Sequence, residues 1–371
     1  MAPPIPGHAT PEGTARYAAR TQAGLAAGHF RLAQGLALGS LGLGTYLGAA
    51  DEGTDQRVSA AASRAVEAGW NVLDTAINYR MQRAERALGA ALADLVGRGA
   101  AARDELLVCS KAGFVPAPDG PAWFRETYLA GPSPLRPSDL VAGCHCLHPD
   151  YLRDQLRRSL ENLGLATVDV YYVHNPETQL GTLDRKTFRA RLRTAFAALE
   201  DEQRAGRLRA YGLATWGALR VPPGHPEHVA LEEVKALAGE AAAATGGGPD
   251  HLAFIQLPIN LGMPEALLAT QPLGKELVPA LEAARALGLT VVASAALAQG
   301  RLLGRLPAAL TARLGQALRS DAQRALQFAR STPGVTTALV GMKAPAHVEE
   351  DLALGELPPL TPEDFLAALQ G

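Results

Sequence analysis

Four residues with side chains suited to proton transfer lie close to the ends of short apolar segments. Asp74 ends one such segment, and Lys111 and His174 directly follow the next two. Tyr79 lies a few residues beyond Asp74. A phenol has a pKa near ~10, and a nearby ammonium group lowers that pKa. We therefore expect Lys111 to lower the pKa of Tyr79, Asp74 to hold Lys111 charged, and His174 to hydrogen-bond the substrate oxygen or the phenol.

Each of these residues, taken alone, also fits a purely structural role. Asp74 can cap a loop, and Lys111 can pair with any carboxylate. His174 can be a hydrogen-bonded rim histidine, and Tyr79 can pack within its own loop. The catalytic interpretation is favoured because the three strand-end positions are consecutive, and active sites of α/β barrels lie at the C-terminal ends of the strands.

The elements that would position these residues follow one repeated order: an amphipathic helix, a glycine, a short apolar strand and a polar or glycine-rich loop. Alternation of strands and helices favours a parallel sheet, and fully apolar strands indicate burial on both faces. Eight units without a glycine-rich dinucleotide turn favour a closed (β/α)₈ TIM barrel over an open doubly wound sheet. The predicted strands are 41–44, 71–74, 106–110, 168–173, 208–213, 253–257, 290–294 and 336–340, and the clearest predicted helices are 55–68, 151–163, 188–205, 277–287 and 322–331.

The remaining segments give the expected domain organisation. Residues 1–28 are rich in Pro, Gly and Ala and predict a flexible N-terminal arm, so that 29–371 form a single barrel domain. Residues 30–38 predict a small hairpin that closes the barrel floor. The long connections 113–149 and 216–251 predict a lid or a wall of the substrate pocket, with surface decoration as the alternative.

Composition excludes several other classes of function. The 371 residues carry 35 basic and 37 acidic side chains, a formal net charge of −2, which favours neither nucleic acid nor an anionic membrane. Three cysteines cannot form a disulfide framework, which predicts a reducing cytoplasm. The first residues lack the pattern of a signal peptide, and no apolar run is long enough to span a bilayer. We expect a small-molecule carbonyl substrate, and the sequence leaves the oligomeric state open.

Several segments together resemble the aldo-keto reductase family over residues 36–355. The most specific is Asp74-Thr75-Ala76-Ile77-Asn78-Tyr79, followed by Glu85-Arg86-Ala87-Leu88-Gly89. The other matching segments are 42–46, 110–111, 169–174, 255–256 with Asn260, 297–300, 340–343 and 350–351.

The resemblance implies reduction of an aldehyde or ketone to an alcohol by hydride transfer from a nicotinamide cofactor. Tyr79 would be the general acid, supported by Lys111 and Asp74, with His174 orienting the carbonyl. NADPH is the implied cofactor, with NADH as the alternative, and it would bind without a Rossmann fold. The implied cofactor-binding residues are Gly44, Thr45, Thr215, Gln256, Ser294, Leu297, Gly300, Gly341, Lys343, His347, Glu350 and Asp351.

The chain departs from the family pattern around the nicotinamide and the adenosine. Ala214-Thr215 replaces the usual Ser-Asn pair, and Ser294 stands where an aromatic residue usually stacks on the nicotinamide. His347 replaces an arginine, and Asp351 replaces an asparagine. These departures keep open a non-catalytic NADPH-binding sensor or regulatory protein of the same fold. A second alternative is a Schiff-base aldolase that uses Lys111.

The segment Cys144-His145-Cys146-Leu147-His148 contains residue types that bind metals. Zinc sites usually combine such a segment with a second, distant pair of ligands, and no second cysteine pair exists in this chain. We therefore interpret the segment as a loop or helix entrance and expect no metal there. Pro149 and Asp150 predict a helix start directly after it.

Overall fold

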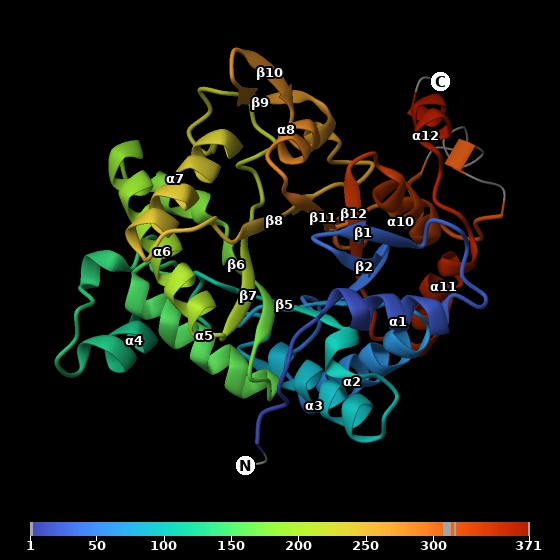
Figure 1. The fold of residues 1–371 in the computed structure, drawn as a ribbon, viewed down its shortest axis with the longest axis horizontal. Coiled ribbons are helices and arrows are strands. Elements are labelled where there is room, and N and C mark those ends of the chain that lie inside the picture. The colour runs from blue at the N-terminus through green and yellow to red at the C-terminus, as the bar shows by residue number, and fades with distance from the viewer. Residues whose placement is uncertain (1–2, 307–312, 315–316, 370–371) are drawn as a thin grey trace.

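Eight parallel strands close into a barrel in this computed structural model, which describes residues 3–306, 313–314 and 317–369. The strand order around the barrel is β11-β12-β3-β4-β5-β6-β7-β8, and helices surround the strands (Figure 1). The (β/α)₈ TIM barrel predicted from the sequence is thereby confirmed. The strands are β3 (Leu41–Gly44), β4 (Val72–Asp74), β5 (Leu107–Ala112), β6 (Val168–His174), β7 (Leu208–Ala214), β8 (Leu252–Pro258), β11 (Thr290–Ser294) and β12 (Val335–Gly341).

A helix follows each barrel strand before the chain enters the next one or ends. These helices are α2 (Glu52–Glu67), α3 (Arg83–Gly97), α5 (Pro149–Leu163), α6 (Arg185–Arg204), α7 (Leu231–Ala244), α8 (Ala280–Ala286), α10 (Asp321–Ser331) and α11 (Pro345–Leu352). The short helix α4 (Gly120–Phe124) lies in the β5–α5 connection, and α12 (Pro362–Leu369) lies near the C-terminus.

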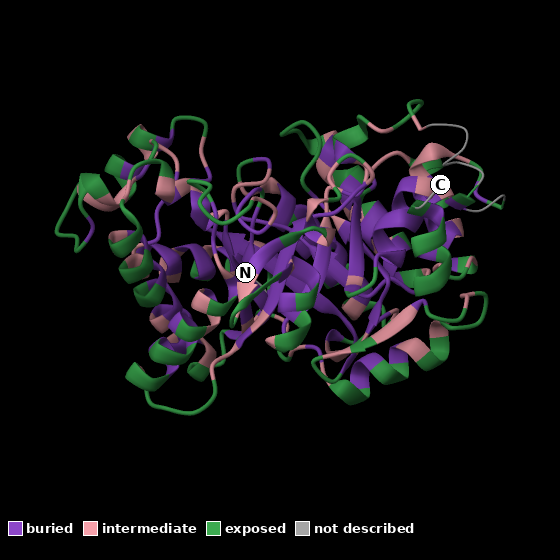
Figure 2. Cartoon of the chain, turned by 90° about the horizontal axis from the view of Figure 1, so that it is seen from above, coloured by how far each residue is buried: buried purple, intermediate pink, exposed green. Residues whose placement is uncertain are grey.

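Helix α5 shows how the sequence specifies one of these units. Pro149 occupies its first turn, Leu152 and Leu156 are buried on its inner face, and Gly164 ends it in the left-handed conformation with φ 66°. This conformation is available to glycine without the steric cost that a Cβ imposes. The helix therefore packs its apolar side against the barrel while its polar side faces solvent, as the other outer helices do in Figure 2.

A two-stranded hairpin and an N-terminal helix lie at the N-terminal ends of the barrel strands. Strands β1 (Phe30–Ala33) and β2 (Leu36–Gly39) form the antiparallel hairpin predicted from the sequence. Helix α1 (Pro11–Thr21) was not predicted, because the composition of residues 1–28 suggested a flexible arm. Tyr17 of this helix is fully buried, and its hydroxyl donates to the carbonyl oxygen of Val66 at 2.5 Å.

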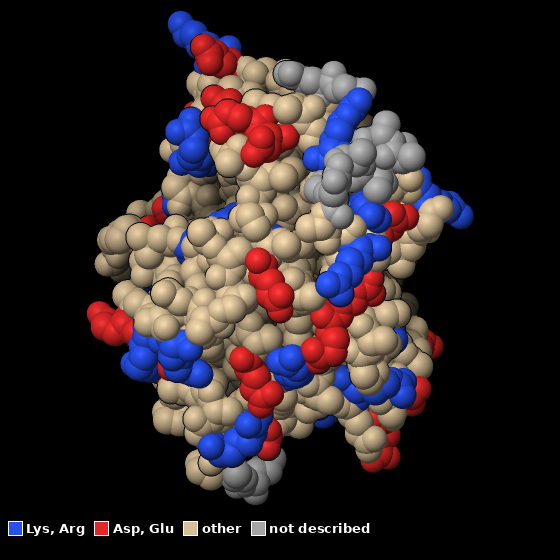
Figure 3. All heavy atoms as spheres, turned by 90° about the vertical axis from the view of Figure 1, so that its right-hand side faces the viewer, with Lys and Arg blue, Asp and Glu red and all other residues tan. Residues whose placement is uncertain are grey.

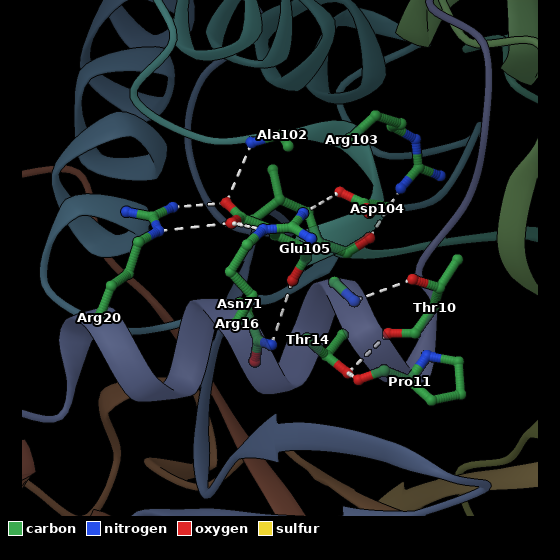
Figure 4. Close-up of polar contacts among 12 residues, drawn as sticks. Thr10, Pro11, Thr14, Arg16, Arg20, Asn71, Ala102, Arg103, Asp104 and Glu105 are labelled. Carbon is green, nitrogen blue, oxygen red and sulfur yellow. Dashed lines mark hydrogen bonds and ion pairs between the residues drawn. The ribbon is translucent and has the colours of Figure 1, made fainter.

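Ion pairs fasten α1 to the short 3₁₀ helix η1 (Arg103–Glu105), as Figure 4 shows. Arg20 lies 2.5 Å from a carboxylate oxygen of Glu105, and Arg16 lies 2.7 Å from Asp104. The composition of the segment suggested an arm, but Tyr17 and the two arginines give this helix a defined docking face. The structure therefore corrects the expected flexible arm to a segment containing a packed helix.

Three predicted helix starts differ from the observed ones by three residues, those of α2, α6 and α8, and the difference at α8 involves a strand. The sequence predicted a helix over 277–287, whereas Glu276–Pro279 form strand β10, which pairs with β9 (Ala269–Leu273), and α8 begins only at Ala280. Pro279 explains this boundary. The proline ring restricts φ to a value that extended backbone also adopts, so Pro279 can end β10 directly before α8 begins. The two strands form a hairpin in the β8–β11 connection, away from the barrel sheet (Figure 1).

The outer surface carries charges of both signs. On the face shown in Figure 3, Lys and Arg side chains lie among Asp and Glu side chains rather than in a field of one sign. The pair Arg64 and Glu349, which links α2 to α11 at 2.8 Å, is one example of such a contact. Within the described residues, every helix is too short or too polar to traverse a bilayer.

Candidate active site

A cleft with a volume of about 610 Å³ opens where the barrel strands end. Its lining includes the last residues of several strands, among them Gly44 of β3, Asp74 of β4 and His174 of β6. The parallel arrangement explains this meeting, because all eight strands present their C-terminal ends at the same rim. The volume falls in the range of sites for cofactors and small molecules.

Lys111 lies beneath the cleft and is completely enclosed. Its ammonium donates to Asp74 Oδ1 at 2.5 Å and to the carbonyl oxygen of Thr75 at 2.8 Å. The other carboxylate oxygen of Asp74 accepts a hydrogen bond from Gln256 Nε2 at 2.8 Å. Burial disfavours the charge on Lys111, but the neighbouring Asp74 and Tyr79 outweigh it, so the pKa of Lys111 is raised and the amine stays charged.

Tyr79 lies directly beside this ion pair. The Lys111 Nζ atom is 4.9 Å from the centroid of the Tyr79 ring, and the ring of Tyr46 packs edge-on against Tyr79 at 4.9 Å between centroids. Burial raises the pKa of Tyr79, and the charge of Lys111 acts in the opposite direction. The sequence predicted a lowered pKa for Tyr79. Lys111 lowers the pKa of Tyr79 as predicted, but burial raises it by more. The predicted net direction of the pKa shift is therefore wrong.

His174 completes the set from the opposite wall. Its ring centroid is 5.8 Å from that of Tyr79, and burial together with the charges of Lys111 and His145 holds its pKa well below the usual value. The imidazole is therefore neutral, so one ring nitrogen carries a proton and the other accepts. Its Nδ1 atom is buried and has no hydrogen-bond partner within the described residues.

The backbone of His174 is fixed by a second histidine. His145 Nε2 lies 2.7 Å from the carbonyl oxygen of His174, and Gln179 Nε2 lies 3.0 Å from His145 Nδ1. Because the amide of Gln179 donates, His145 accepts at Nδ1 and donates from Nε2. Gly113 makes this contact possible, because a Cβ at its position would lie 2.6 Å from His145 Nε2.

The segment 144–148, which contains residue types that bind metals, therefore has a structural role. His145 supports His174, and the ring of His148 caps α5 by accepting from the backbone N–H of Asp150 at 3.2 Å. The predicted start of α5 at Pro149 is confirmed. Within the described residues, no group of three or more His, Cys, Asp or Glu side chains is arranged to hold a metal ion.

Most of the residues assigned to the cofactor lie together along the cleft. The lining contains Gly44, Thr45, Thr215, Gln256, Ser294, Leu297, Gly300, Gly341, Lys343 and His347. Glu350 and Asp351 do not line it. The backbone carbonyl of Glu350 accepts from Gln323 at 2.7 Å, and Asp351 is buried on α11.

These residues fit a dinucleotide. Three glycines line the cleft and let a ligand approach the backbone closely, and Lys343 supplies a positive charge next to Gly341. Thr215 Oγ1 is buried without a hydrogen-bond partner in the described part of the chain, so it is free to contact a bound polar group. Gln256 is different, because its amide already donates to Asp74.

Several lining residues were missed by the sequence analysis. They are Tyr46, Leu47, Asn78, Phe114, Asn175, Trp216, Ala295, Ala296, Gln299, Leu303, Leu339 and Val340. Many of them directly follow a strand end, and this position is the signal that could have identified them. Of the long connections, 113–149 contributes Phe114 and 216–251 contributes Trp216 to the wall. The other aromatic residues of the first connection pack elsewhere, for example Tyr128, whose hydroxyl donates to Asp154 of α5.

Comparisons with known proteins agree with this fold and these motifs. The model of the aldo/keto reductase family matches residues 40–222. D-threo-aldose 1-dehydrogenase from Pseudomonas sp is 31% identical over 201 residues, which cover 49% of this chain and 52% of the relative. The chain thus matches about half or less of the length of such curated relatives.

Solved structures extend the similarity over nearly the whole barrel. An aldo-keto reductase from Bacillus halodurans in its holo form has a TM-score of 0.61 and 20% identity, covering 92% of this chain and 95% of the other. An aldo/keto reductase from Klebsiella pneumoniae in complex with NADP and acetate has a TM-score of 0.59 and 20% identity, covering 92% and 93%. The chain is thus similar to the aldo-keto reductase family over residues 40–222 and shares the barrel fold of these solved structures.

Proposed function

We propose that this protein reduces an aldehyde or ketone to an alcohol with NADPH as the hydride donor and Tyr79 as the general acid. The observation that carries the proposal is the contact of Tyr79 with the enclosed Lys111–Asp74 ion pair at the floor of the cleft. The structurally similar Klebsiella protein was solved with NADP, which supports the choice of cofactor.

The roles of the residues follow from their charge and position. The bound nicotinamide would supply a hydride to the carbonyl carbon. Tyr79 stays protonated at neutral pH because burial raises its pKa, so its hydroxyl is available to donate a proton to the carbonyl oxygen. The ammonium of Lys111 then stabilises the phenolate that remains, and neutral His174 donates a hydrogen bond that orients the carbonyl.

Cofactor binding would use the backbone of Gly44, Gly300 and Gly341 together with Thr215. Lys343 would meet the 2′-phosphate that distinguishes NADPH from NADH, acting as a point charge. Asp74 has a supporting task, because it keeps Lys111 charged and is itself fixed by Gln256.

The Schiff-base alternative fits the site less well. A lysine that forms an imine must be uncharged and must reach the substrate carbon. Lys111 has no exposed surface and a raised pKa, so it meets neither requirement. The regulatory alternative is favoured by one feature, the smaller number of polar contacts for the nicotinamide carboxamide. Ala214 offers no hydroxyl and the amide nitrogen of Gln256 already donates to Asp74, while Thr215 Oγ1 has no partner within the described residues.

The test is turnover of an aldehyde with NADPH by the purified chain and by its Tyr79→Phe variant. General acid catalysis contributes ~10²–10⁴-fold, so the variant should lose that much of kcat. Its Kd for NADPH, measured by fluorescence titration, should stay within about threefold, because the phenol oxygen is the only atom removed. Absence of turnover in the unaltered protein, together with tight NADPH binding, would instead favour the regulatory alternative.

A further inference from the structure

Three consecutive residues directly after Tyr79 have a left-handed backbone conformation. The φ angles are 48° at Arg80, 55° at Met81 and 69° at Gln82. Residues with a Cβ adopt this conformation at a steric cost, and normally only as single residues. A run of three therefore needs contacts from the surrounding structure that outweigh the cost. We refer to residues 80–82 as the left-handed turn.

One carboxylate of α2 joins the beginning of this turn to the helix that follows it. Asp55 Oδ1 accepts from Arg80 Nη1 at 2.6 Å, and Asp55 Oδ2 lies 2.6 Å from Arg83 Nη2. Arg83 is the first residue of α3, which packs beside α2 (Figure 1). Asp55 therefore bridges the two ends of the segment that contains the left-handed turn.

The contact between Asp55 and Arg80 is largely enclosed. The side chain of Arg80 is 2% exposed and that of Asp55 is 21% exposed. The Nε and Nη2 atoms of Arg80 are buried and have no hydrogen-bond partner within the described residues. Removal of one partner of a buried ion pair leaves the other charge uncompensated, which is costly. Loss of the Asp55 carboxylate should therefore drive Arg80 out of its present position and change the turn.

The left-handed turn also fixes the backbone of Tyr79. The backbone N–H of Ala84, which lies beyond the turn, donates to the carbonyl oxygen of Tyr79 at 3.4 Å. A change in the turn would shift the ring of Tyr79 away from Lys111, whose Nζ atom is 4.9 Å from the ring centroid. A displacement of about 1 Å at a reacting group can cost ~10²-fold in rate. Asp55 does not line the cleft, so its effect on the reaction passes through the turn.

We propose that Asp55 is a positioning residue that holds the left-handed turn and thereby keeps the hydroxyl of Tyr79 in place for proton transfer. The inference rests on the proposed reductase function. Because Asp55 lies outside the cleft, its loss should slow the chemical step and leave the binding of aldehyde and cofactor nearly unchanged.

Single and double variants at Asp55 and Met81 provide the test, with methylglyoxal as the aldehyde. Asp55→Ala should lower the single-turnover rate of NADPH oxidation by about 10- to 100-fold, while the KM for methylglyoxal and the Kd for NADPH change by less than about threefold. Addition of Met81→Gly should restore most of the rate, because glycine adopts the left-handed conformation without steric cost. Addition of Met81→Ala should not restore it, because alanine keeps the Cβ that causes the cost.

Two further measurements separate this role from a general loss of stability. Asp94→Asn removes a carboxylate from an exposed ion pair with Arg98 at the end of α3, and it should leave the rate unchanged. Trypsin should cleave the Arg80–Met81 bond at least about tenfold faster in Asp55→Ala than in the unaltered protein, because the turn opens more often. Asp94→Asn should not accelerate this cleavage.

The outcomes distinguish the inference from the reductase function. An unchanged rate in Asp55→Ala, equal rescue by Met81→Gly and Met81→Ala, or a loss confined to KM would overturn the inference while leaving the reductase function intact. Lack of NADPH-dependent turnover in the unaltered protein would overturn the reductase function itself. In either case, equal cleavage of Asp55→Ala and the unaltered protein by trypsin would show that Asp55 does not hold the turn.

Discussion

Replacement of Asp351 by asparagine should stabilise the protein, and by more at alkaline than at acidic pH. Asp351 is 3% exposed, and its Oδ1 atom has no hydrogen-bond partner within the described residues. Burial, and to a lesser degree the charge of Glu350, raises its pKa from 3.8 to about 7. The folded state therefore resists ionisation of a carboxyl group that ionises readily in the unfolded chain.

The sign of the effect follows from proton linkage. Below about pH 4 the carboxyl is protonated in both states and costs nothing. As the pH rises from about 4 to about 7, the unfolded state releases its proton first, so the free energy of unfolding falls. Each pH unit between the two pKa values contributes ~1.36 kcal/mol, which gives about 4 kcal/mol above pH 7 as an upper bound. An asparagine side chain carries no charge, so the Asp351→Asn variant should recover a substantial part of this penalty.

Chemical denaturation at about pH 5 and about pH 8 measures the effect directly. The gain in unfolding free energy from Asp351→Asn should be larger at the higher pH by roughly 1–3 kcal/mol. Glu282→Gln on α8 is a matched control, because Glu282 is exposed and should show little change at either pH. A gain that is equal at the two pH values, or a loss that grows with pH, would refute the reasoning about Asp351.

Three other perturbations address the site and its support. Lys111→Met should raise the pKa of Tyr79 further, because the positive charge that opposes the effect of burial is lost, and it should slow alcohol oxidation more than carbonyl reduction at neutral pH. Unchanged pH profiles in both directions would exclude an effect of Lys111 on the pKa of Tyr79. Lys343→Ala should weaken NADPH binding by about 10- to 100-fold and leave NADH nearly unaffected in fluorescence titrations, whereas equal losses would remove Lys343 from the phosphate site. Gly113→Ala should destabilise the fold by about 1–3 kcal/mol in denaturation, because Gly113 has φ 134° and its Cβ would collide with His145; wild-type stability would show that this contact adapts freely.

The sequence predicted best those features that a local residue pattern alone specifies. Strands 41–44 and 290–294 were predicted with their observed bounds, because short apolar runs have few alternative structures in a repeated βα chain. The four residues expected to transfer protons were chosen from strand ends and the loop after β4. The structure places Asp74, Tyr79 and His174 in one cleft, with Lys111 paired to Asp74. The parallel topology alone was sufficient to predict that these residues lie close together.

Features that depend on distant partners were not predictable in this way. Helix α1 acquires its place from Glu105 and Val66, which are remote in the sequence, so local composition suggested an arm. The net pKa of Tyr79 depends on how deeply the barrel encloses it, and a residue list carries no measure of depth. The support of His174 by His145 likewise requires the long connection to fold back, which no periodic pattern indicates.

The path of the N-terminal segment has a practical consequence for handling the protein. Ile5 forms a bridge with Leu165, and the backbone N–H of Ala9 donates to Asp169 at 2.6 Å. Both partners stand before or at the beginning of β6, the end of the barrel opposite to the cleft. A tether attached ahead of Ile5 would hold the molecule by its floor, so that immobilised protein presents its open cleft to the solution.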